Sequence, residues 1–277
     1  MRDYGALKLT IADSVATVAM HSPVDLPIQH PHNVHVELAQ VFNDLREDHS
    51  VRVIVLTGAG DSFFVVRPPE SYHDSEQRRS RTDPARMWES FSSTAMMHEQ
   101  MALIEKPIVA KVNGDAIGFG STLVFACDLI IARDDATIID THMGMGETPN
   151  IGPDDFGLVP GDGGTALIPL FFPPPLAKEY LMLGRAFTGE ELARMGVINY
   201  AVSAAELDGF VSDFVQRLLL RSAYALAWTK RTANRPVVAQ VTSALDSGLA
   251  YEMVTFHQWE RLGWTDTKHF DGTPTAT

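Results

Sequence analysis

The chain has 277 residues, which is enough for one large domain or for a core with a small appendage. Its hydrophobic residues, 45% of the total, can build a sizeable core, and its 21% charged residues argue against a disordered chain. A formal net charge of −13 disfavours nonspecific binding to nucleic acid or to anionic membranes. It does not exclude an anionic ligand, which a few local Lys or Arg side chains would hold.

The sequence also argues against an internal disulfide and against a membrane-spanning segment. The single cysteine, Cys127, lies in an apolar stretch and cannot form an internal disulfide, which predicts a buried thiol. The N-terminal segment has no apolar run of signal-peptide length, and no stretch is long and apolar enough to span a bilayer. We therefore expect a soluble cytoplasmic protein without a membrane partner.

The first quarter of the chain predicts alternating strands and helices. Residues 7–20 predict two strands around an Ala-Asp-Ser turn, and residues 33–46 have the periodicity of an amphipathic helix. Residues 51–58 predict a buried strand, and the strand–helix–strand order predicts that the flanking strands run parallel. The Pro-rich residues 21–32 predict a loop. No metal site is expected there, because the spacing of its three histidines matches no zinc-binding pattern. These histidines are His21, His30 and His32.

A glycine-containing segment then leads into a long polar loop. Residues 71–83 are charged and aperiodic, which is typical of a loop covering a site, and their arginines are candidates for contacts with phosphate groups. Asp83 and Pro84 have the residue types of a helix N-cap and first turn, so a helix is expected from there to about Ile104.

The chemistry is expected in residues 106–164. An apolar strand at residues 107–112 ends in an Asn-Gly turn, and the loop Gly118-Phe119-Gly120 precedes a helix over residues 121–127. A second apolar run, residues 129–132, returns to the sheet. Strand, glycine loop and helix together direct backbone N–H groups at one point, which suits an anion or an oxygen that becomes anionic during a reaction.

The C-terminal part of the chain is predicted to be mainly helical. Helices are expected over residues 176–183, 207–228 and 236–262, with a short strand at residues 197–202. Capping boxes are predicted at two Ser/Thr-x-x-Glu patterns, which begin at Thr188 and Ser203.

Four segments, in this order, resemble the crotonase (enoyl-CoA hydratase/isomerase) superfamily over about residues 6–262. They read KPIVAKVNGDAIGFG, CDLIIARDDA, GLVPGDGG and AKEYLMLGRAFTGEELARMGVINYAV. The resemblance implies an α/β fold, a spiral of strand–strand–helix turns with a helical C-terminal region. It implies a spiral core with the active site in residues 1–200, a C-terminal trimerisation region in residues 201–277, and homotrimers or hexamers.

The resemblance also implies an oxyanion hole made by the backbone N–H groups of Arg67 and Phe119. Arg67 stands where the family usually has a small residue, and the two prolines after it narrow the backbone geometry. The implied substrate is an acyl-CoA thioester, so coenzyme A enters as part of the substrate and no tightly bound cofactor is expected.

The acid–base residues depart from the family pattern. Hydratases of the family use two glutamates, and the matching positions here are Thr122 and His142. Threonine cannot act as an acid or base near neutral pH, whereas histidine can. Asp162, in the VPGDGG segment, is the second candidate, and its alternative role is that of a helix cap. We therefore expect His142 and Asp162 to move protons in this protein.

One branch of the superfamily, the β-diketone hydrolases such as 6-oxocamphor hydrolase, is similar in the Asp140-x-His142, VPGDG and GLAYE elements. That similarity implies water-driven C–C cleavage of a β-dicarbonyl substrate without coenzyme A, with His35 and Glu252 also near the substrate. A catalytically silent family member serving in an assembly is the third alternative. An inserted loop, residues 144–155, contributes the further candidates Glu147, Asp154 and Asp155.

Overall fold

The computed structural model describes residues 2–21, 33–65, 83–143 and 157–261, without the side chains of residues 258–261. Arg67 and the two polar loops, residues 71–82 and 144–155, lie outside these ranges. None of the helices in these ranges is long and apolar enough to cross a membrane.

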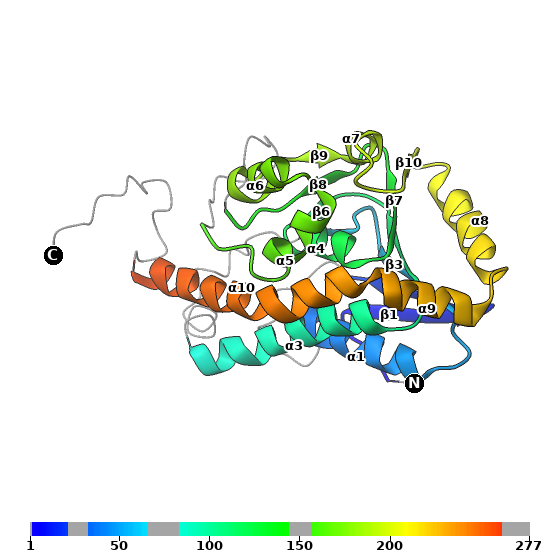
Figure 1. The fold of residues 1–277 in the computed structure, drawn as a ribbon, viewed down its shortest axis with the longest axis horizontal. Helices are drawn as coiled ribbons and strands as arrows, with labels where there is room; N and C mark the ends of the chain where they lie inside the picture. The colour runs from blue at the N-terminus through cyan, green and yellow to red at the C-terminus, as the bar shows by residue number, and fades with distance from the viewer. Residues whose placement is uncertain (1, 22–32, 66–82, 144–156, 262–277) are drawn as a thin grey trace.

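Two β-sheets form the centre of the protein (Figure 1). The larger sheet has the order β1-β2-β3-β5-β7-β10. The first two of its strands pair antiparallel and the rest run parallel. These strands are β1 (Leu7–Ala12), β2 (Val15–Met20), β3 (Val53–Gly58), β5 (Ile108–Val112), β7 (Leu129–Arg133) and β10 (Tyr200–Val202). The smaller sheet has the order β4-β6-β8-β9, and its strands are β4 (Phe64–Val65), β6 (Ala116–Ile117), β8 (Thr137–Ile139) and β9 (Phe187–Thr188).

Helices cover both sheets and extend beyond them. They are α1 (Val34–Glu47), α3 (Pro84–Leu103), α4 (Phe119–Ala126), α5 (Gly164–Phe171), α6 (Pro174–Leu183), α7 (Gly189–Arg194), α8 (Leu207–Leu219), α9 (Ala223–Ala233) and α10 (Arg235–Arg261). Helix α8 packs its apolar stripe against one face of the large sheet, where it contacts three valines of β3 and β5 and Ile131 of β7. The long helices α3 and α10 lie side by side and bring distant parts of the chain together.

Several local predictions that fall on described residues are confirmed, whereas the loops predicted over residues 21–32 and 71–83 lie almost entirely outside the described residues. Strands β2 and β3, which flank α1, pair in parallel as the strand–helix–strand order predicts. Helix α3 begins where expected, because the Asp83 side chain accepts a hydrogen bond from the N–H of Ala85. The predicted capping box at Thr188 is complete, with Glu191 as its second member. Cys127 is buried, and burial raises the pKa of its thiol.

Two predictions of the C-terminal half are wrong. Residues 207–228 form two helices, α8 and α9, because Arg52 donates to the backbone oxygens of Leu219 and Arg221 and Ser222 caps the next helix. These groups satisfy the carbonyl and N–H groups that a helix end leaves open. The Ser203 capping box is also incorrect, since α8 begins after Glu206 and the Ser203 hydroxyl donates to the Glu206 carboxylate.

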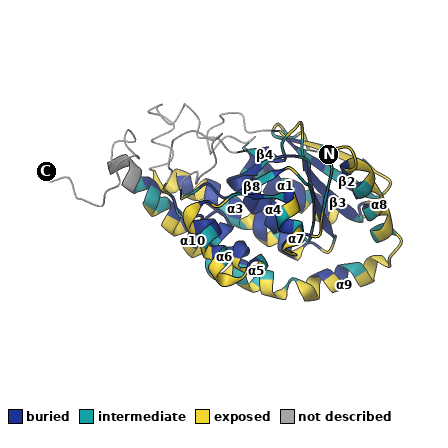
Figure 2. Ribbon diagram, turned by 90° about the horizontal axis from the view of Figure 1, so that it is seen from above, coloured by how far each residue is buried: buried dark blue, intermediate teal, exposed yellow. Residues whose placement is uncertain are grey.

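The most buried residues lie in the sheets and on the helix faces that cover them (Figure 2). The strands and the inner faces of α1, α3, α4 and α5 form the main apolar core. Helix α9 is largely exposed and contributes few buried side chains, whereas α10 buries one face along much of its length. Because α10 packs against both α3 and α5, the C-terminal helix reaches the same region of the protein as the glycine-rich segments of the middle of the chain.

Candidate active site

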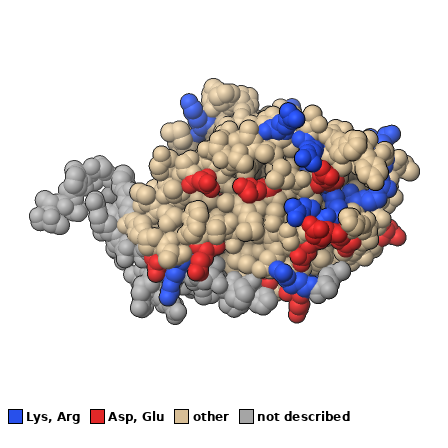
Figure 3. All heavy atoms as spheres, turned by 60° about the horizontal axis from the view of Figure 1, so that its bottom comes forward, with Lys and Arg blue, Asp and Glu red and all other residues tan. Residues whose placement is uncertain are grey.

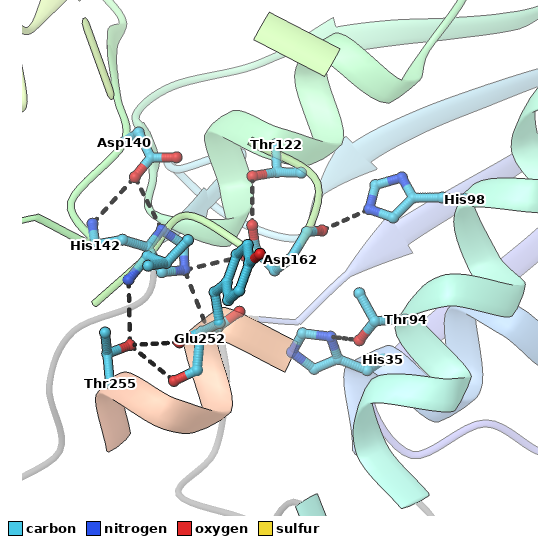
Figure 4. A network of polar contacts seen from close by, with 11 residues as sticks. His35, Thr94, His98, Thr122, Asp140, His142, Asp162, Glu252 and Thr255 are labelled. Atoms are coloured by element: carbon cyan, nitrogen blue, oxygen red, sulfur yellow. Dashed lines mark hydrogen bonds and ion pairs between the residues drawn. The ribbon is translucent and has the colours of Figure 1, made fainter. Parts of the chain in front are cut away.

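A buried cluster of acidic and histidine side chains lies where β8, α4, α5 and α10 meet (Figure 4). His142 follows β8, and its imidazole is held from one side by Asp140. Both the backbone N–H and the Nδ1 of His142 donate to Oδ1 of Asp140, at 3.0 and 2.8 Å. An ionised carboxylate has no hydrogen to donate, so Nδ1 must carry the proton of this hydrogen bond. The other ring nitrogen, Nε2, then points away from Asp140.

Asp162 occupies the other side of the imidazole. Its Oδ2 lies 3.4 Å from Nε2 of His142, and its Oδ1 accepts a 3.0 Å hydrogen bond from the hydroxyl of Thr122. The alternative prediction, that Asp162 caps the following helix, is wrong. The N-cap of α5 is Gly163, and no side-chain hydrogen bond is made there. The Asp162 carboxylate is therefore directed into the cluster and not at the helix end.

The third carboxylate comes from the C-terminal helix. Glu252 of α10 is only 5% exposed, and its Oε1 lies 4.0 Å from Nε2 of His142. Helix α10 can approach so closely because glycines face each other at this point. A Cβ built on Gly161 would lie 2.3 Å from the carbonyl oxygen of Gly248. The N–H of Val159 also donates to the hydroxyl of Thr255 on the same helix.

His35, from the start of α1, completes the group. Its Nδ1 lies 2.9 Å from the hydroxyl of Thr94, and its ring stacks on Phe119 with 4.1 Å between ring centroids. It also lies near enough to Asp162 to lower the pKa of that carboxyl, although His142 has the larger effect. The four side chains named from the sequence, His35, His142, Asp162 and Glu252, are thus brought together from four separate parts of the chain.

The charges in the cluster set the protonation states of its two central groups. Burial opposes charge on both groups, but their mutual attraction is stronger. Burial alone would lower the pKa of His142, yet the charges of Asp162 and Asp140 raise it well above 6.5. Burial alone would raise the pKa of Asp162, yet the nearby imidazolium and the Thr122 hydrogen bond lower it below 3.8. At neutral pH the pair is therefore an imidazolium next to a carboxylate.

The N-terminus of α4 lies beside this pair. Gly118 adopts a left-handed conformation, with φ 62°, and its N–H donates to the carbonyl oxygen of Ile139. Among the residues that the structure describes, no acceptor is found for the N–H groups of Phe119 and Gly120. Gly120 leaves no room for a side chain, because a Cβ there would lie 2.0 Å from the carbonyl oxygen of Phe64 in β4. Two open N–H groups at a helix N-terminus suit an anionic oxygen.

Several of the predicted site residues lie outside the described part of the chain. Arg67, the other predicted oxyanion-hole donor, lies just beyond β4 and outside the described residues, and so do Glu147, Asp154 and Asp155 of the inserted loop. Among the described residues on either side of it, the N–H of Leu158 donates to the carbonyl oxygen of His142. Within the described ranges, no group of three or more His, Cys, Asp or Glu side chains has the arrangement of a metal site.

Two residues to which the sequence assigns no role are part of the cluster. Asp140 orients His142, and its position two residues earlier, at the end of a strand, is the signal that would have identified it. His98 of α3 is buried, and its Nε2 lies 2.6 Å from the backbone oxygen of Asp162. No sequence pattern links residues 98 and 162, so only the packing of α3 against the VPGDGG segment reveals this contact.

The protein thus has an α/β fold of mainly parallel strands, and its buried His142–Asp162 pair lies beside the N-terminus of α4. Residues 10–262 match the sequence signature of the family described as "Enoyl-CoA hydratase/isomerase". The protein belongs to this family, the crotonase superfamily, as its sequence segments indicate.

Individual relatives agree with this assignment. The carnitinyl-CoA dehydratase of Escherichia coli is 30% identical over 217 residues, which cover 77% of this chain and 76% of the relative. The short-chain-enoyl-CoA hydratase of Clostridium acetobutylicum is 26% identical over 79% of this chain and 76% of its own length. A β-diketone hydrolase from the cyanobacterium Anabaena, solved with (S)-3-oxocyclohexyl acetic acid, shares the fold with a TM-score of 0.77 and 22% identity. The match covers 93% of this chain and 96% of that one.

Proposed function

We propose that the protein adds water to, or removes water from, an acyl-CoA thioester, with His142 as the acid and Asp162 as the base. The observation that carries this proposal is the 3.4 Å approach of His142 Nε2 to Asp162 Oδ2 beside the N-terminus of α4. One group of this pair is protonated and the other is ionised at neutral pH. A hydratase needs both, because it takes one proton from water and gives one proton to carbon.

The proposed step conserves protons. The Asp162 carboxylate takes a proton from water while the oxygen of that water bonds to the β-carbon of an α,β-unsaturated thioester. The electron pair of the double bond moves onto the thioester oxygen, and the open N–H groups at Phe119 and Gly120 stabilise the resulting enolate. We include the N–H of Arg67 as a further donor. His142 then protonates the α-carbon, and the proton held by Asp162 returns to His142 across the short gap between them.

The acyl-CoA assignment is supported by the relatives. The sequence relatives at 26–30% identity are named as enzymes of CoA thioesters, and in such reactions coenzyme A is part of the substrate. No tightly bound cofactor is therefore needed. The structure adds that Thr122, at the position of a usual family glutamate, donates a hydrogen bond to Asp162. Asp162 thus takes the place that a glutamate would fill as the base.

A second candidate is hydrolysis of a β-dicarbonyl compound between its two carbonyl groups. The observation that favours it is the gathering of His35, His142, Asp162 and Glu252, the set that the resemblance to the β-diketone hydrolases implies. The same pair serves this reaction. Asp162 takes a proton from the water that attacks one carbonyl, the C–C bond breaks, and His142 protonates the enolate that leaves. No CoA is involved.

One comparison of substrates separates the two candidates. The purified protein is mixed with crotonyl-CoA, and the loss of the enoyl-thioester absorbance is followed. A parallel reaction with a cyclic β-diketone is followed by the appearance of the ring-opened acid. Turnover of crotonyl-CoA alone supports the hydratase, and turnover of the diketone alone supports the C–C hydrolase. If high protein concentrations convert neither compound, both proposals fail for these substrates and a silent assembly role gains support.

Variants then test the residues. We expect His142→Asn and Asp162→Asn each to lower kcat by about 10²- to 10⁴-fold, the usual contribution of a positioned acid or base. Asp208→Asn is the control, because Asp208 also pairs with a cation, Lys111, but its side chain is 86% exposed on α8. Wild-type activity in both cluster variants would contradict the assignment.

We also propose that residues 201–277 contribute to a homotrimer or hexamer. The last two helices carry exposed aromatic side chains. Tyr224 and Trp228 of α9 are 74% and 62% exposed and lie next to each other, and Tyr251 of α10 is 63% exposed. Figure 3 shows wide uncharged areas between small mixed groups of acidic and basic side chains on one face. Light scattering coupled to gel filtration checks the assembly, and a monomer at micromolar concentration would contradict it.

A further inference from the structure

A second buried histidine holds the backbone of the proposed base. His98 lies on α3, is 2% exposed, and places its Nε2 2.6 Å from the backbone oxygen of Asp162. A carbonyl oxygen can only accept a hydrogen bond, so Nε2 must carry the hydrogen. This contact joins α3 to the VPGDGG segment at the residue whose carboxylate faces His142.

The peptide that follows Asp162 fits closely against the same ring. Gly163 has φ +128°, a conformation that residues with a side chain rarely adopt. A Cβ built on it would lie 2.5 Å from Nε2 of His98 and 2.7 Å from Cγ2 of Thr122. The imidazole of His98 and the side chain of Thr122 therefore occupy the space that a side chain at residue 163 would need, and the peptide after Asp162 packs directly against both.

Asp162 is thus fixed at two places. The His98 imidazole holds its backbone oxygen, and the Thr122 hydroxyl holds Oδ1 of its carboxylate. With these two atoms fixed, Oδ2 is the oxygen left to face Nε2 of His142. A shift of about 1 Å at a reacting group can lower a rate by about 100-fold, so the position of this backbone bears directly on catalysis.

The environment keeps His98 in the form that this role needs. Burial lowers the pKa of His98, and the smaller opposing effects come from Asp162. A neutral imidazole still donates from Nε2, whereas a charged one would add a positive charge beside the pair. His98 therefore acts as a hydrogen-bond donor without competing with His142 for the negative charge of Asp162.

We propose that His98 is a positioning residue, which acts through Asp162 and sets the contact between that carboxylate and His142. The inference rests on the proposed function only in its kinetic consequence. Its structural content, a dependence of the Asp162–His142 contact on the His98 donor, is testable without any substrate.

The first experiment therefore measures the imidazole of His142 directly. NMR of the full-length protein with isotope-labelled histidine gives the pH midpoint of each ring, and His142→Asn identifies the signal. In the wild type the neighbouring charges are Asp140, Asp162 and Glu252, with His35 nearby. We expect His98→Leu to move the His142 midpoint to lower pH, because Asp162 is then free to withdraw from the imidazolium. His98→Gln, whose amide can still donate, should restore the wild-type midpoint.

A control separates positioning from general destabilisation. Met101→Ala removes a buried side chain from α3 about one turn further along the helix, where it is 1% exposed. It should lower the thermal midpoint of unfolding without moving the His142 midpoint. If His98→Leu leaves the His142 midpoint unchanged while lowering stability as Met101→Ala does, His98 is only a packing residue and the inference is overturned.

The second experiment uses whichever substrate the protein converts. We expect His98→Leu to lower kcat by about 10- to 100-fold with little change in KM, and His98→Gln to recover most of the loss. Unchanged kcat in His98→Leu, measured on folded protein, would overturn the role in catalysis. If neither candidate substrate reacts, the proposed function fails, but the NMR result still decides whether His98 positions Asp162.

Discussion

The hydroxyl of Thr122 donates a 3.0 Å hydrogen bond to Oδ1 of Asp162, and both residues are buried. Thr122, which cannot act as an acid or base, thus stands at a position where the family usually has a glutamate. It binds Asp162, which has the role of the base in our proposal. The hydrogen bond favours the ionised carboxylate and adds to the larger effect of His142, which together lower the pKa of Asp162.

Removing this hydroxyl should change the acid side of the pH profile. Thr122→Val keeps the shape of the side chain and loses the donor, so the pKa of Asp162 should rise. The acid limb of kcat/KM should then move to higher pH, and the free energy of unfolding should fall by about 1–3 kcal/mol. Thr122→Ser retains the hydroxyl and is the matched control. Equal acid limbs in Thr122→Val and Thr122→Ser would show that the hydrogen bond has no effect on Asp162.

The pH dependence of the wild type should reflect the imidazolium–carboxylate pair. Asp162 has a lowered pKa, so the base is available once the pH exceeds a value below 3.8. His142 has a raised pKa, so the acid remains protonated well above pH 6.5. We expect kcat/KM to be high at neutral pH and to fall as His142 loses its proton. In Asp162→Asn any residual activity should fall at lower pH; an unchanged alkaline limb would argue that another group titrates.

Stability should depend on pH through the same histidine. A group whose pKa is raised by folding stabilises the protein fully below its unfolded value, here 6.5, and this contribution is lost as pH rises through the folded pKa. The thermal midpoint of the wild type should therefore decline above pH 6.5. His142→Asn should show a smaller decline over the same range. Parallel curves for the two proteins would mean that His142 contributes no pH-dependent stability.

Two glycines with positive φ offer a test of close packing at the cluster. A Cβ on Gly163 would contact His98 and Thr122, whereas a Cβ on Gly60 would meet nothing within 4 Å. Both Gly163→Ala and Gly60→Ala carry the cost of an unfavourable backbone conformation, about 1–3 kcal/mol. Only Gly163→Ala should also displace Asp162 and abolish most activity. Urea unfolding and kcat together check this, and equal losses in both variants would refute the packing argument.

A buried ion pair outside the cluster should matter for stability alone. Lys230 is 7% exposed, and its Nζ donates to Asp128 Oδ2 at 2.7 Å and to the backbone oxygens of Met101 and Lys106. Lys230→Met leaves the partly buried Asp128 carboxylate, whose side chain is 15% exposed, without its cation, which should cost up to about 3–5 kcal/mol in urea unfolding. Lys111→Met breaks the exposed pair with Asp208 and should cost less than about 1 kcal/mol. Similar losses in both variants would contradict the burial argument.

Local sequence signals predicted much of the fold because they depend on neighbouring residues. Asp83 caps α3 and Thr188 caps α7 as their patterns indicate, since a capping side chain needs only the next few N–H groups. The break between α8 and α9 was missed because Arg52, far away in sequence, binds the backbone oxygens at the end of α8. An amphipathic pattern that continues through a break carries no sign of such a contact.

The site residues also differ in whether a local sequence segment identifies them or only a long-range contact does. His142 and Asp162 were found because each stands in a recognisable segment, and the structure brings them within 3.4 Å of each other. Glu252 was named only through the resemblance to the β-diketone hydrolases, because its approach to the imidazole depends on the close packing of Gly161 against Gly248, which are distant in sequence. No sequence pattern identifies His98, because its partner is a backbone oxygen and every residue has one.

The contribution of α10 to the cluster has a consequence for biosynthesis. Domains fold as the ribosome delivers them, from the N-terminus onward. Here Glu252 and Gly248, the glycine at which its helix meets Gly161, follow every described strand in the chain. A nascent chain whose helix α10 is still in the exit tunnel therefore lacks the contact of Glu252 with His142. The cluster should therefore stay incomplete until α10 has left the ribosome and packed against α3 and α5.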